Sequence, residues 1–322
     1  MSIASPRILR IAADVQAARL RIGDKIARTP CLASRRTEGL WFKTENFQHT
    51  GSFKLRGAMS KLTTLSTETD VVTASSGNHG IACAHAALTT GHRLTVVLPE
   101  MVAKAKLKKI QSYGTKTILQ PGDPGKAEQH ARAMAEQGDY VYVSPYNDPM
   151  VMAGQGTIGL ELMEQLPQID NVFISLGGGG LVSGVGAALK AVSPNTRIVG
   201  VSAINTAALA ASIVAGKVVE TEHLETLADG CAGGVDDDAL TLPVASEVID
   251  DLVYCTEDQI AVALRTLAWQ ENMIVEGAAG LALAGYLSEP DYKSNQVSVI
   301  LLCGANYDAQ VIQPIITAQQ PE

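Results

Sequence analysis

The chain is organised around the segment Asn171-Val-Phe-Ile-Ser-Leu-Gly-Gly-Gly-Gly-Leu-Val-Ser-Gly-Val-Gly-Ala-Ala-Leu-Lys190. Residues 172–176 form an apolar run of strand length, four glycines follow, and the small residues after them predict a helix. A strand that turns through glycines into a helix leaves backbone N–H groups pointing at one spot. Because glycine permits the unusual backbone angles and close approach that a phosphate requires, this segment is a candidate phosphate-binding loop. A plain glycine-rich turn that packs a helix onto a sheet fits the same pattern.

Two common phosphate-binding motifs do not describe this loop. No Gly-Lys-Ser/Thr follows the glycines, so the loop is not a P-loop. It does not fit Gly-x-Gly-x-x-Gly either, because its four glycines are contiguous: Gly177, Gly178, Gly179 and Gly180. The segment therefore predicts an anion-binding unit of another kind.

The composition limits the possible classes of protein. The 322 residues suffice for one large or two medium domains, and 46% of them are hydrophobic, which is ample for a buried core. With 25 Lys and Arg against 33 Asp and Glu, the formal net charge is −8, so nucleic-acid binding is not expected. No apolar run reaches the roughly 18 residues of a membrane span, and charged residues interrupt the N-terminal segment where a secretory signal would be apolar. Five scattered cysteines without Cys-x-x-Cys indicate reduced thiols in a cytoplasm.

Residues 70–145 alternate between strand and helix patterns. Helices between apolar strands are typical of parallel βαβ units, and this set is about as long as one small domain. The expected strands are 71–74, 93–98, 117–119 and 140–144, and the expected helices are 80–90, 103–113 and 125–137.

The flanking parts of the chain predict a second α/β unit. Ser5 before Pro6 and Asp148 before Pro149 have the cap-then-proline pattern of helix starts, and the second of these helices reaches about residue 165. Further strands are expected at 40–43, 172–176, 197–201 and 297–302, and further helices at 207–215, at 257–271 and after 275–280; residues 227–238 form an acidic, glycine-rich loop.

Lys54 stands at the start of a predicted helix, between Phe53 and Leu55. A lysine at the positive end of a helix dipole and in apolar surroundings has a lowered pKa, which makes its amine a nucleophile or a base. A solvated lysine on an amphipathic helix is the alternative.

Two further segments carry polar groups at the ends of predicted strands. Ser75-Ser-Gly-Asn-His-Gly80 offers hydroxyls, an amide and free N–H groups to a carboxylate, although an ordinary N-cap with a turn glycine also fits. Cys303-Gly-Ala-Asn306 follows the strand at 297–302, and ligands of open α/β sheets bind at the carboxyl ends of strands. A buried structural thiol is the alternative for Cys303.

The order of these segments is more specific than any one of them. Phe47-Gln-His-Thr-Gly-Ser-Phe-Lys-Leu-Arg-Gly-Ala58, the serine-rich segment, the four glycines and the cysteine segment resemble, over nearly the whole chain, the pyridoxal-phosphate serine/threonine dehydratase family, which includes serine racemase and the hydroxyaspartate dehydratases. The resemblance implies an α/β fold like that of tryptophan synthase β, with two open, parallel, twisted sheets flanked by helices. It also implies a large cofactor-binding domain over 1–69 and 146–322, a small mobile domain over 70–145, and a homodimer.

The resemblance further implies a role for each candidate residue. Lys54 looks like the lysine that forms the internal Schiff base with pyridoxal 5'-phosphate. Phe53 is expected to pack against the pyridine ring, Asn78 to bond the phenolic oxygen, and Cys303 to face the pyridine nitrogen. The phosphate is expected at Gly177, Gly178, Gly179, Gly180 and the N–H of Leu181, and the substrate carboxylate at Ser75, Ser76 and His79.

The reaction that the resemblance implies is an α,β-elimination on serine, threonine or 3-hydroxyaspartate. The substrate amine displaces Lys54, which then removes the α-proton while the cofactor ring accepts the electrons. A β-hydroxyl leaves, and hydrolysis gives a 2-keto acid and ammonia. A neutral thiol at Cys303 would not keep the ring nitrogen protonated, which favours prompt elimination.

Two other functions and two substrate details stay open. A serine or aspartate racemase would use Ser76 as a second base, on the face opposite Lys54. A non-catalytic amino-acid sensor is the other function, but the intact lysine argues against it. His49, and the Gly-Ala-Ala-Gly after Glu276, depart from relatives and leave the substrate open. Lys126 is a candidate for binding a second carboxylate, with a solvated lysine as the alternative.

No divalent-metal site is expected. Metal-dependent relatives place a glutamate just after the strand that follows the phosphate helix and an aspartate shortly afterwards, and an ungapped reading puts Ser202 and Ala208 there. Calcium and magnesium need several oxygen ligands with carboxylate charge, which a hydroxyl and a methyl group cannot supply. The acidic run Asp236-Asp-Asp238 lies in a separate loop and is expected to be solvated.

Overall fold

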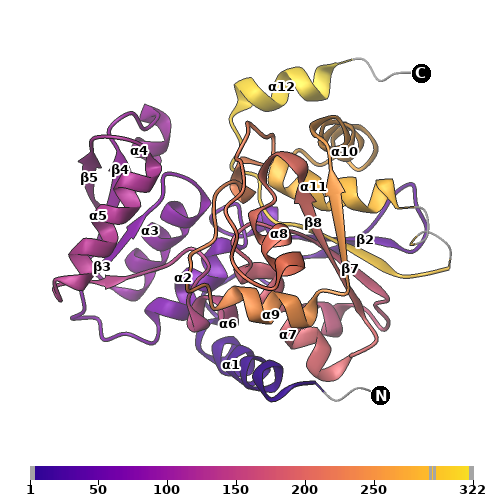
Figure 1. The fold of residues 1–322 in the computed structure, drawn as a ribbon, viewed down its shortest axis with the longest axis horizontal. Helices are drawn as coiled ribbons and strands as arrows, with labels where there is room; N and C mark the ends of the chain where they lie inside the picture. Colours follow the sequence, from indigo (N-terminus) through magenta and orange to yellow (C-terminus); the bar gives the residue numbers. More distant parts are fainter. Residues whose placement is uncertain (1–3, 290–291, 293–294, 319–322) are drawn as a thin grey trace.

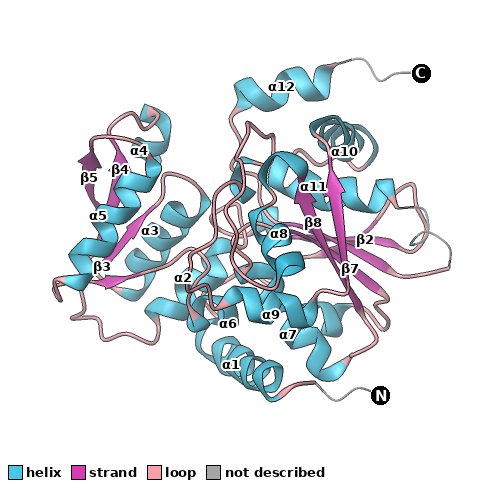
Figure 2. Ribbon diagram, in the orientation of Figure 1, coloured by secondary structure: helices cyan, strands magenta, loops and turns pink. Residues whose placement is uncertain are grey.

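The computed structural model describes residues 4–289, 292 and 295–318, and it consists of two α/β lobes that lie side by side (Figures 1 and 2). The small lobe contains a four-stranded sheet and the large lobe a six-stranded sheet. Within the described residues, no helix combines the length and the apolar character that crossing a membrane requires.

The small lobe is an entirely parallel sheet with connecting helices. Its strand order is β5 (Lys116–Gln120), β4 (Leu94–Pro99), β3 (Val71–Ala74) and β6 (Val141–Tyr142), and each neighbouring pair is parallel. The connecting helices are α3 (Asn78–Thr90), α4 (Lys104–Gln111) and α5 (Pro124–Glu136). The predicted alternation is confirmed, with ends shifted by at most two residues.

The large sheet is parallel except at one edge. Its order is β1 (Cys31–Ala33), β2 (Leu40–Thr44), β10 (Ser298–Leu302), β7 (Asn171–Ser175), β8 (Arg197–Ala203) and β9 (Asp251–Cys255). Only β1 and β2 pair antiparallel. The expectation of a fully parallel sheet is therefore corrected at this edge, because a short connection joins antiparallel rather than parallel strands. The sequence pattern predicts neither β1 nor β9 as a strand.

The helices of the large lobe pack in two groups. One group is α1 (Pro6–Ile22), α2 (Lys54–Leu62), α6 (Pro149–Gln165) and α7 (Gly180–Val192), and the other is α10 (Glu257–Gln270), α11 (Gly277–Ser288) and α12 (Ala309–Thr317). Helix α9 (Thr241–Val248) packs against α7, and α8 (Ala208–Ala215) packs against α9. The short 3-10 helices are η1 (Glu45–Phe47), η2 (Ile204–Thr206) and η3 (Asp229–Cys231). The sequence pattern does not predict α9 and α12.

Both predicted helix caps form. Ser5 Oγ accepts a hydrogen bond from the N–H of Ile8 at 3.3 Å. Asp148 Oδ1 accepts from the N–H groups of Met150 and Val151 at 2.7 and 3.2 Å. In each helix a proline follows the cap at the position where its missing N–H costs nothing.

A buried ionic cluster holds α2 in place. Arg56 donates to Glu45 at 2.7 and 2.8 Å and to Glu161 at 2.7 Å. Lys43 Nζ donates to Glu161 at 2.6 Å, so two cations balance two anions inside the core. Removing one partner of such a pair costs about 3–5 kcal/mol, because the other charge is left buried. The cluster therefore fixes α2, which begins at Lys54, against β2 and α6.

Candidate active site

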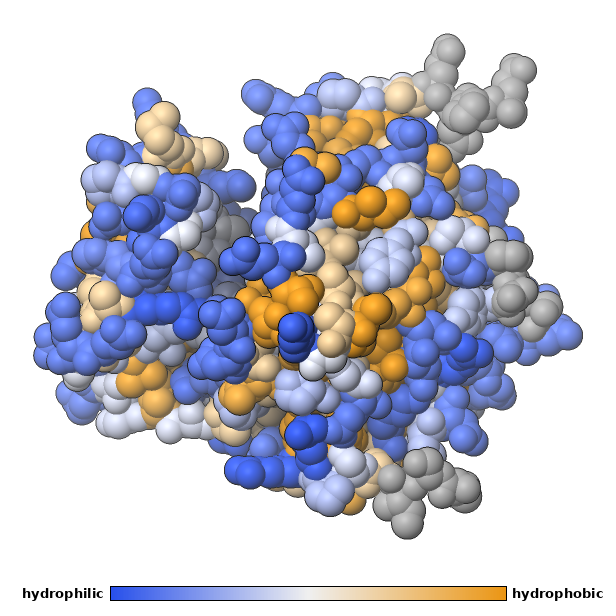
Figure 3. Space-filling model, viewed as in Figure 1, coloured by the Kyte–Doolittle hydropathy of each residue, from blue (hydrophilic) through white to orange (hydrophobic). Residues whose placement is uncertain are grey.

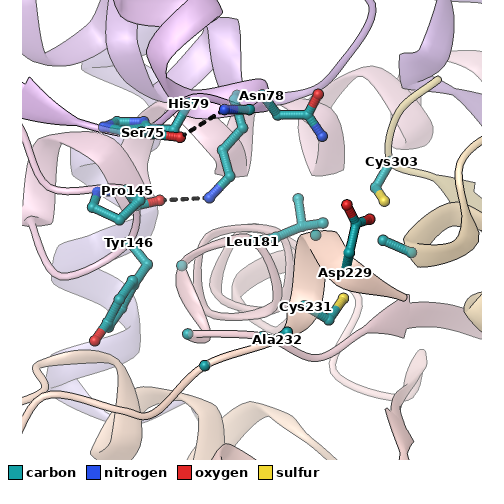
Figure 4. Close-up of a pocket in the computed structure, with 18 of the residues that line it drawn as sticks. Ser75, Asn78, His79, Pro145, Tyr146, Leu181, Asp229, Cys231, Ala232 and Cys303 are labelled. Atoms are coloured by element: carbon teal, nitrogen blue, oxygen red, sulfur yellow. Dashed lines mark hydrogen bonds between the residues drawn. The ribbon is translucent and has the colours of Figure 1, made fainter. Parts of the chain in front are cut away.

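One cavity of about 670 Å³ lies between the lobes (Figure 4). The view of the molecular surface is hollowed along the same boundary (Figure 3). The strands β3, β7 and β10 all end at this cavity, as expected for parallel sheets. Its lining contains all the residues expected to hold the cofactor or the substrate α-carboxylate: Phe53, Lys54, Ser75, Ser76, Asn78, His79, Gly177, Gly178, Gly179, Gly180, Leu181 and Cys303.

The glycine loop is built as an anion cradle at the start of α7. The N–H groups of residues 177–182 donate no hydrogen bond to any described residue. Gly179 has a φ of +88°, in the left-handed region, and a Cβ on Gly178 would lie 2.4 Å from the ring of Tyr146. Only glycine fits both positions, and free N–H groups at a helix N-terminus attract an anion such as phosphate.

Lys54 is the first residue of α2 and lines the cavity together with Pro145. Its Nζ donates a 2.8 Å hydrogen bond to the carbonyl oxygen of Pro145 and lies 5.2 Å from the ring centroid of Phe53. Burial lowers the pKa of the Lys54 amine, because desolvation disfavours the charged form. This direction agrees with the sequence-based expectation.

Backbone pairing brings Cys303 beside the lysine segment. The N–H of Phe53 donates to the carbonyl oxygen of Cys303 at 3.0 Å, and the N–H of Ala305 donates to Gly51 at 2.9 Å. Burial, and then the charge of Glu276, raise the pKa of the Cys303 thiol well above its usual value. The thiol is therefore neutral.

The serine-rich segment connects β3 to α3. Ser75 Oγ accepts a hydrogen bond from the N–H of Gly77 at 3.2 Å, whereas the Ser76 hydroxyl makes none with any described residue. His79 is 3% exposed, and its Nε2 bonds the carbonyl oxygen of Val143 at 2.9 Å. Because a carbonyl only accepts, Nε2 carries the proton and Nδ1 of the neutral ring is an acceptor.

His79 consequently does not offer what a carboxylate needs. Burial, and then the nearby Lys54, lower the pKa of His79 to about 3, so its imidazole is neutral. The ring's one N–H is already committed to Val143, and an acceptor nitrogen cannot bind a carboxylate. The expected carboxylate contact of this side chain is thus unsupported, although the residue lines the cavity.

Glu276 is a buried carboxylate in the cavity wall, immediately before α11. It is 4% exposed, and its Oε1 and Oε2 accept hydrogen bonds from Asn78 Nδ2 at 2.8 Å and from the N–H of Asn306 at 3.0 Å. Burial raises the pKa of Glu276 to about 7. The sequence analysis mentions Glu276 only as the residue before the Gly-Ala-Ala-Gly that departs from relatives, and it gives Glu276 no role.

Sequence reasoning missed two other parts of the lining. Tyr146 follows Pro145, and its hydroxyl accepts a hydrogen bond from the N–H of Asp236 at 2.9 Å. Residues 229–234, including η3, form a further part of the cavity wall, in which Figure 4 labels Asp229, Cys231 and Ala232. Neither part has a motif, and the one available signal was the cluster of glycines in that loop.

Two expectations about charged residues are corrected or unsupported. Asp236 is not simply solvated: Arg132 of α5 donates to it at 3.0 Å and Asn147 at 3.0 Å, so it ties the two lobes together. Lys126 is exposed and is absent from the cavity lining, although Gly125 and Glu128 belong to it. A second-carboxylate contact at Lys126 has no support in this arrangement.

The positions where metal-dependent relatives carry acidic ligands are buried here. Ser202 and Ala208 are 2% and 4% exposed. Among the described residues, no group of three or more His, Cys, Asp or Glu side chains is arranged to hold a metal ion. The expectation of metal-independent activity is tested by chelation, as discussed below.

A lysine amine with a lowered pKa shares one interlobe cavity with a cradle of free N–H groups, an arrangement that fits an enzyme with a phosphorylated cofactor. The chain belongs to the pyridoxal-phosphate dependent enzyme family, whose sequence profile matches residues 22–304, and within it to the serine/threonine dehydratases. The predicted family, fold class and cofactor are thereby confirmed.

Three relatives illustrate the similarity. An L-threonine ammonia-lyase of Thermotoga maritima is 39% identical over 280 residues, which cover 86% of this chain and 69% of that protein. The structure of maize serine racemase superposes with a TM-score of 0.87 at 31% identity, over 94% of this chain and 95% of that one. The processed form of threonine deaminase isoform 2 from Solanum lycopersicum gives a TM-score of 0.90 at 29% identity, over 97% and 88%.

Proposed function

We propose that this enzyme is an ammonia-lyase that converts a β-hydroxy amino acid to a 2-keto acid and ammonia by α,β-elimination. The observation that carries the proposal is the Lys54 amine, which has a lowered pKa and lines the same cavity as the free N–H groups of the glycine loop. The 39% identical L-threonine ammonia-lyase supports this choice among the chemistries of the family.

The lining residues fit pyridoxal 5'-phosphate by their chemistry. The N–H groups of residues 177–181 would hold its phosphate, and Phe53 would pack against its ring. Asn78 would donate to its phenolic oxygen, and the neutral thiol of Cys303 would face its ring nitrogen. When bound, the cofactor supplies an electron sink for the carbanion that proton removal leaves behind.

Lys54 is the proposed base. Its amine is neutral more often than that of a solvated lysine, so a lone pair is available on Nζ to take the α-proton of the substrate. The carbonyl oxygen of Pro145 accepts one hydrogen bond from Nζ. The lone pair of the neutral amine is not used in this bond and stays available for the reaction. The substrate carboxylate is assigned to the hydroxyls and N–H groups of residues 75–77, since the His79 ring is committed elsewhere.

Racemisation of serine or aspartate is the alternative activity. The Ser76 hydroxyl lines the same cavity as Lys54 and makes no hydrogen bond with any described residue, so it is available as a second acid or base. The similarity to maize serine racemase favours keeping this alternative.

One substrate panel tests both activities. The purified holoenzyme is given L- and D-serine, L-threonine, and threo- and erythro-3-hydroxyaspartate, and both keto acid and stereoinversion are measured. Keto acid and ammonia in equal amounts from at least one substrate are expected. Inversion without keto acid would replace the lyase by the racemase, and neither product from any substrate would reject both.

Three further properties belong to the same proposal. The cofactor domain comprises residues 1–69 and 146–322, and a small domain of residues 70–145 moves to close the cavity. The protein is a homodimer, which light scattering after gel filtration tests, and exposed Trp269 and Val311 at the α10 and α12 end of the large lobe support an interface. A cytoplasmic location is supported by five free cysteines.

A further inference from the structure

Four polar side chains form a hydrogen-bonded interlobe network. Lys109 Nζ donates to Asn306 Oδ1 at 2.7 Å, and Asn306 Nδ2 donates to Asn78 Oδ1 at 2.7 Å. Asn78 Nδ2 in turn donates to Glu276 Oε1 at 2.8 Å. Lys109 and Asn78 belong to α4 and α3 of the small lobe, whereas Asn306 follows β10 and Glu276 precedes α11 in the large lobe. Each of the three hydrogen bonds therefore crosses the boundary between the lobes.

The two ends of the interlobe network have fixed polarity. The Lys109 ammonium can only donate hydrogen bonds. Both carboxyl oxygens of Glu276 accept from N–H groups, Oε1 from Asn78 Nδ2 and Oε2 from the backbone N–H of Asn306. An asparagine amide has one donor end and one acceptor end, so charged neighbours dictate which way it faces. Asn306 must turn its Oδ1 to Lys109, and Asn78 must turn its Nδ2 to Glu276. Neither amide can turn over without losing its hydrogen bonds.

Two further hydrogen bonds also fix the orientation of Asn306. Its Nδ2 donates to the carbonyl oxygen of Thr50 at 2.8 Å, and its backbone N–H donates to Glu276 Oε2 at 3.0 Å. Both contacts agree with the orientation that Lys109 imposes. Asn78 Nδ2 donates only to Glu276 among the described residues, so one of its two hydrogens is unused at the cavity wall.

We propose that Glu276 and Lys109 are positioning residues that hold the Asn78 amide with its unused N–H turned into the cavity. The inference rests on the proposed function, which gives Asn78 an oxygen of the cofactor to bind. Since the three hydrogen bonds join the lobes, the amide has its fixed orientation only when the lobes are together. Orientation of Asn78 and closure of the cavity are thus one event.

Cofactor binding to the apoprotein provides the test, because it does not depend on turnover. Pyridoxal 5'-phosphate is titrated into apoprotein, and its dissociation constant and absorption spectrum are recorded. Glu276→Gln gives Asn78 a partner that both donates and accepts, so binding is expected to weaken about tenfold with a shifted absorption band. Lys109→Met removes the donor end and is expected to weaken binding about threefold. Lys108→Met, an exposed neighbour on the same helix, is the matched control and is expected to bind as wild type.

The double variant separates positioning from general destabilisation. If both residues act through Asn78, Glu276→Gln combined with Lys109→Met should bind the cofactor no more weakly than Glu276→Gln alone. Independent effects would multiply. Thermal melts of the apoproteins check that each variant is folded.

Lys109→Met tests the proposal even if Glu276→Gln does not fold. Lys109 is exposed, so its replacement is expected to leave the protein folded. Affinity and spectrum unchanged from wild type in Lys109→Met would overturn the proposal, as would multiplicative losses in the double variant. A wild-type protein that binds the cofactor and releases no keto acid would instead reject the proposed function, and the binding results would stand.

Discussion

The ring of Tyr146 lies across Gly178, so close that a Cβ on the glycine would stand 2.4 Å from the ring carbons. The tyrosine hydroxyl is anchored on the other side by the N–H of Asp236 at 2.9 Å. The ring therefore cannot move away without breaking its contact to the 229–238 loop. This packing explains why the phosphate cradle needs glycine even at a position where the backbone angles do not.

Gly178→Ala is predicted to disrupt the cradle. The added methyl group overpacks against the Tyr146 ring, which should destabilise the apoprotein by about 1–3 kcal/mol and weaken cofactor binding. Gly234→Ala is the matched control, since a Cβ there meets nothing nearer than His223 Nε2 at 4.0 Å. Thermal melts of both apoproteins measure the difference, and equal melting temperatures would contradict the packing argument.

Lys54 is predicted to be the covalent attachment point of the cofactor. Borohydride reduction of the holoenzyme followed by peptide mapping should find the pyridoxyl group on Lys54 alone, with exposed Lys126 as an internal control. Lys54→Ala should abolish keto acid production while the fold persists, because the amine makes one hydrogen bond within the described residues, to Pro145. A pyridoxyl group found on another lysine would contradict the assignment of Lys54.

His79 is predicted to make the protein sensitive to acid. Its folded pKa of about 3 lies below the ordinary value of 6.5, so the stability gained from the neutral ring is present above pH 6.5 and is lost as the pH falls towards 3. The loss is at most about 1.4 kcal/mol per pH unit. The pKa of Glu276 is raised to about 7, so this residue makes the free energy of unfolding rise as the pH falls from 7 to 4.5, opposite to the effect of His79. The contribution of His79 is therefore measured by comparing wild type with a His79 variant.

His79→Gln isolates this contribution. Its side-chain amide can donate to Val143 and does not titrate, so the free energy of unfolding should fall less steeply than that of wild type between pH 6.5 and 4.5. Urea titrations of the two apoproteins at several pH values measure the slopes. Parallel slopes would mean that His79 does not set the acid sensitivity.

Ser76 is predicted to matter for stereoinversion and little for elimination. If its hydroxyl is the second acid or base, Ser76→Ala should suppress racemisation and largely spare keto acid formation. Ser75→Ala is the matched comparison, because the Ser75 hydroxyl is already bonded to the N–H of Gly77. Equal loss of both activities in Ser76→Ala would show that the hydroxyl only binds the substrate carboxylate.

Activity is predicted to survive exhaustive chelation. An ungapped reading of the sequence puts Ser202 and Ala208 where metal-dependent relatives have acidic ligands, and neither side chain carries a charge. Asp236, from the acidic run 236–238, is paired with Arg132. Turnover before and after chelator treatment, with and without added magnesium, tests this. Activity that a chelator abolishes and magnesium restores would point to a carboxylate outside these positions.

The local patterns predicted most elements because each has its own signal. The glycine loop, the caps at Ser5 and Asp148 and the alternation in residues 70–145 all depend on neighbours in sequence. The elements that the patterns miss are short or lie at the edge of a sheet: β1 has three residues and α9 eight. Such segments contain too few residues to show a clear hydrophobic periodicity. Their existence depends on packing against β2 and against α7 and α8.

By itself the sequence predicted the type of most elements, and the order of four short motifs singled out Lys54 and the glycine loop as the expected cofactor-binding groups. Tertiary structure alone decided what surrounds them. His79 is committed to Val143, Asp236 is held by Arg132, and Glu276 meets Asn78, each through a contact between segments distant in the chain. Hydrogen-bond polarity and burial act through space, so their consequences for charge and orientation exist only once both lobes are folded together.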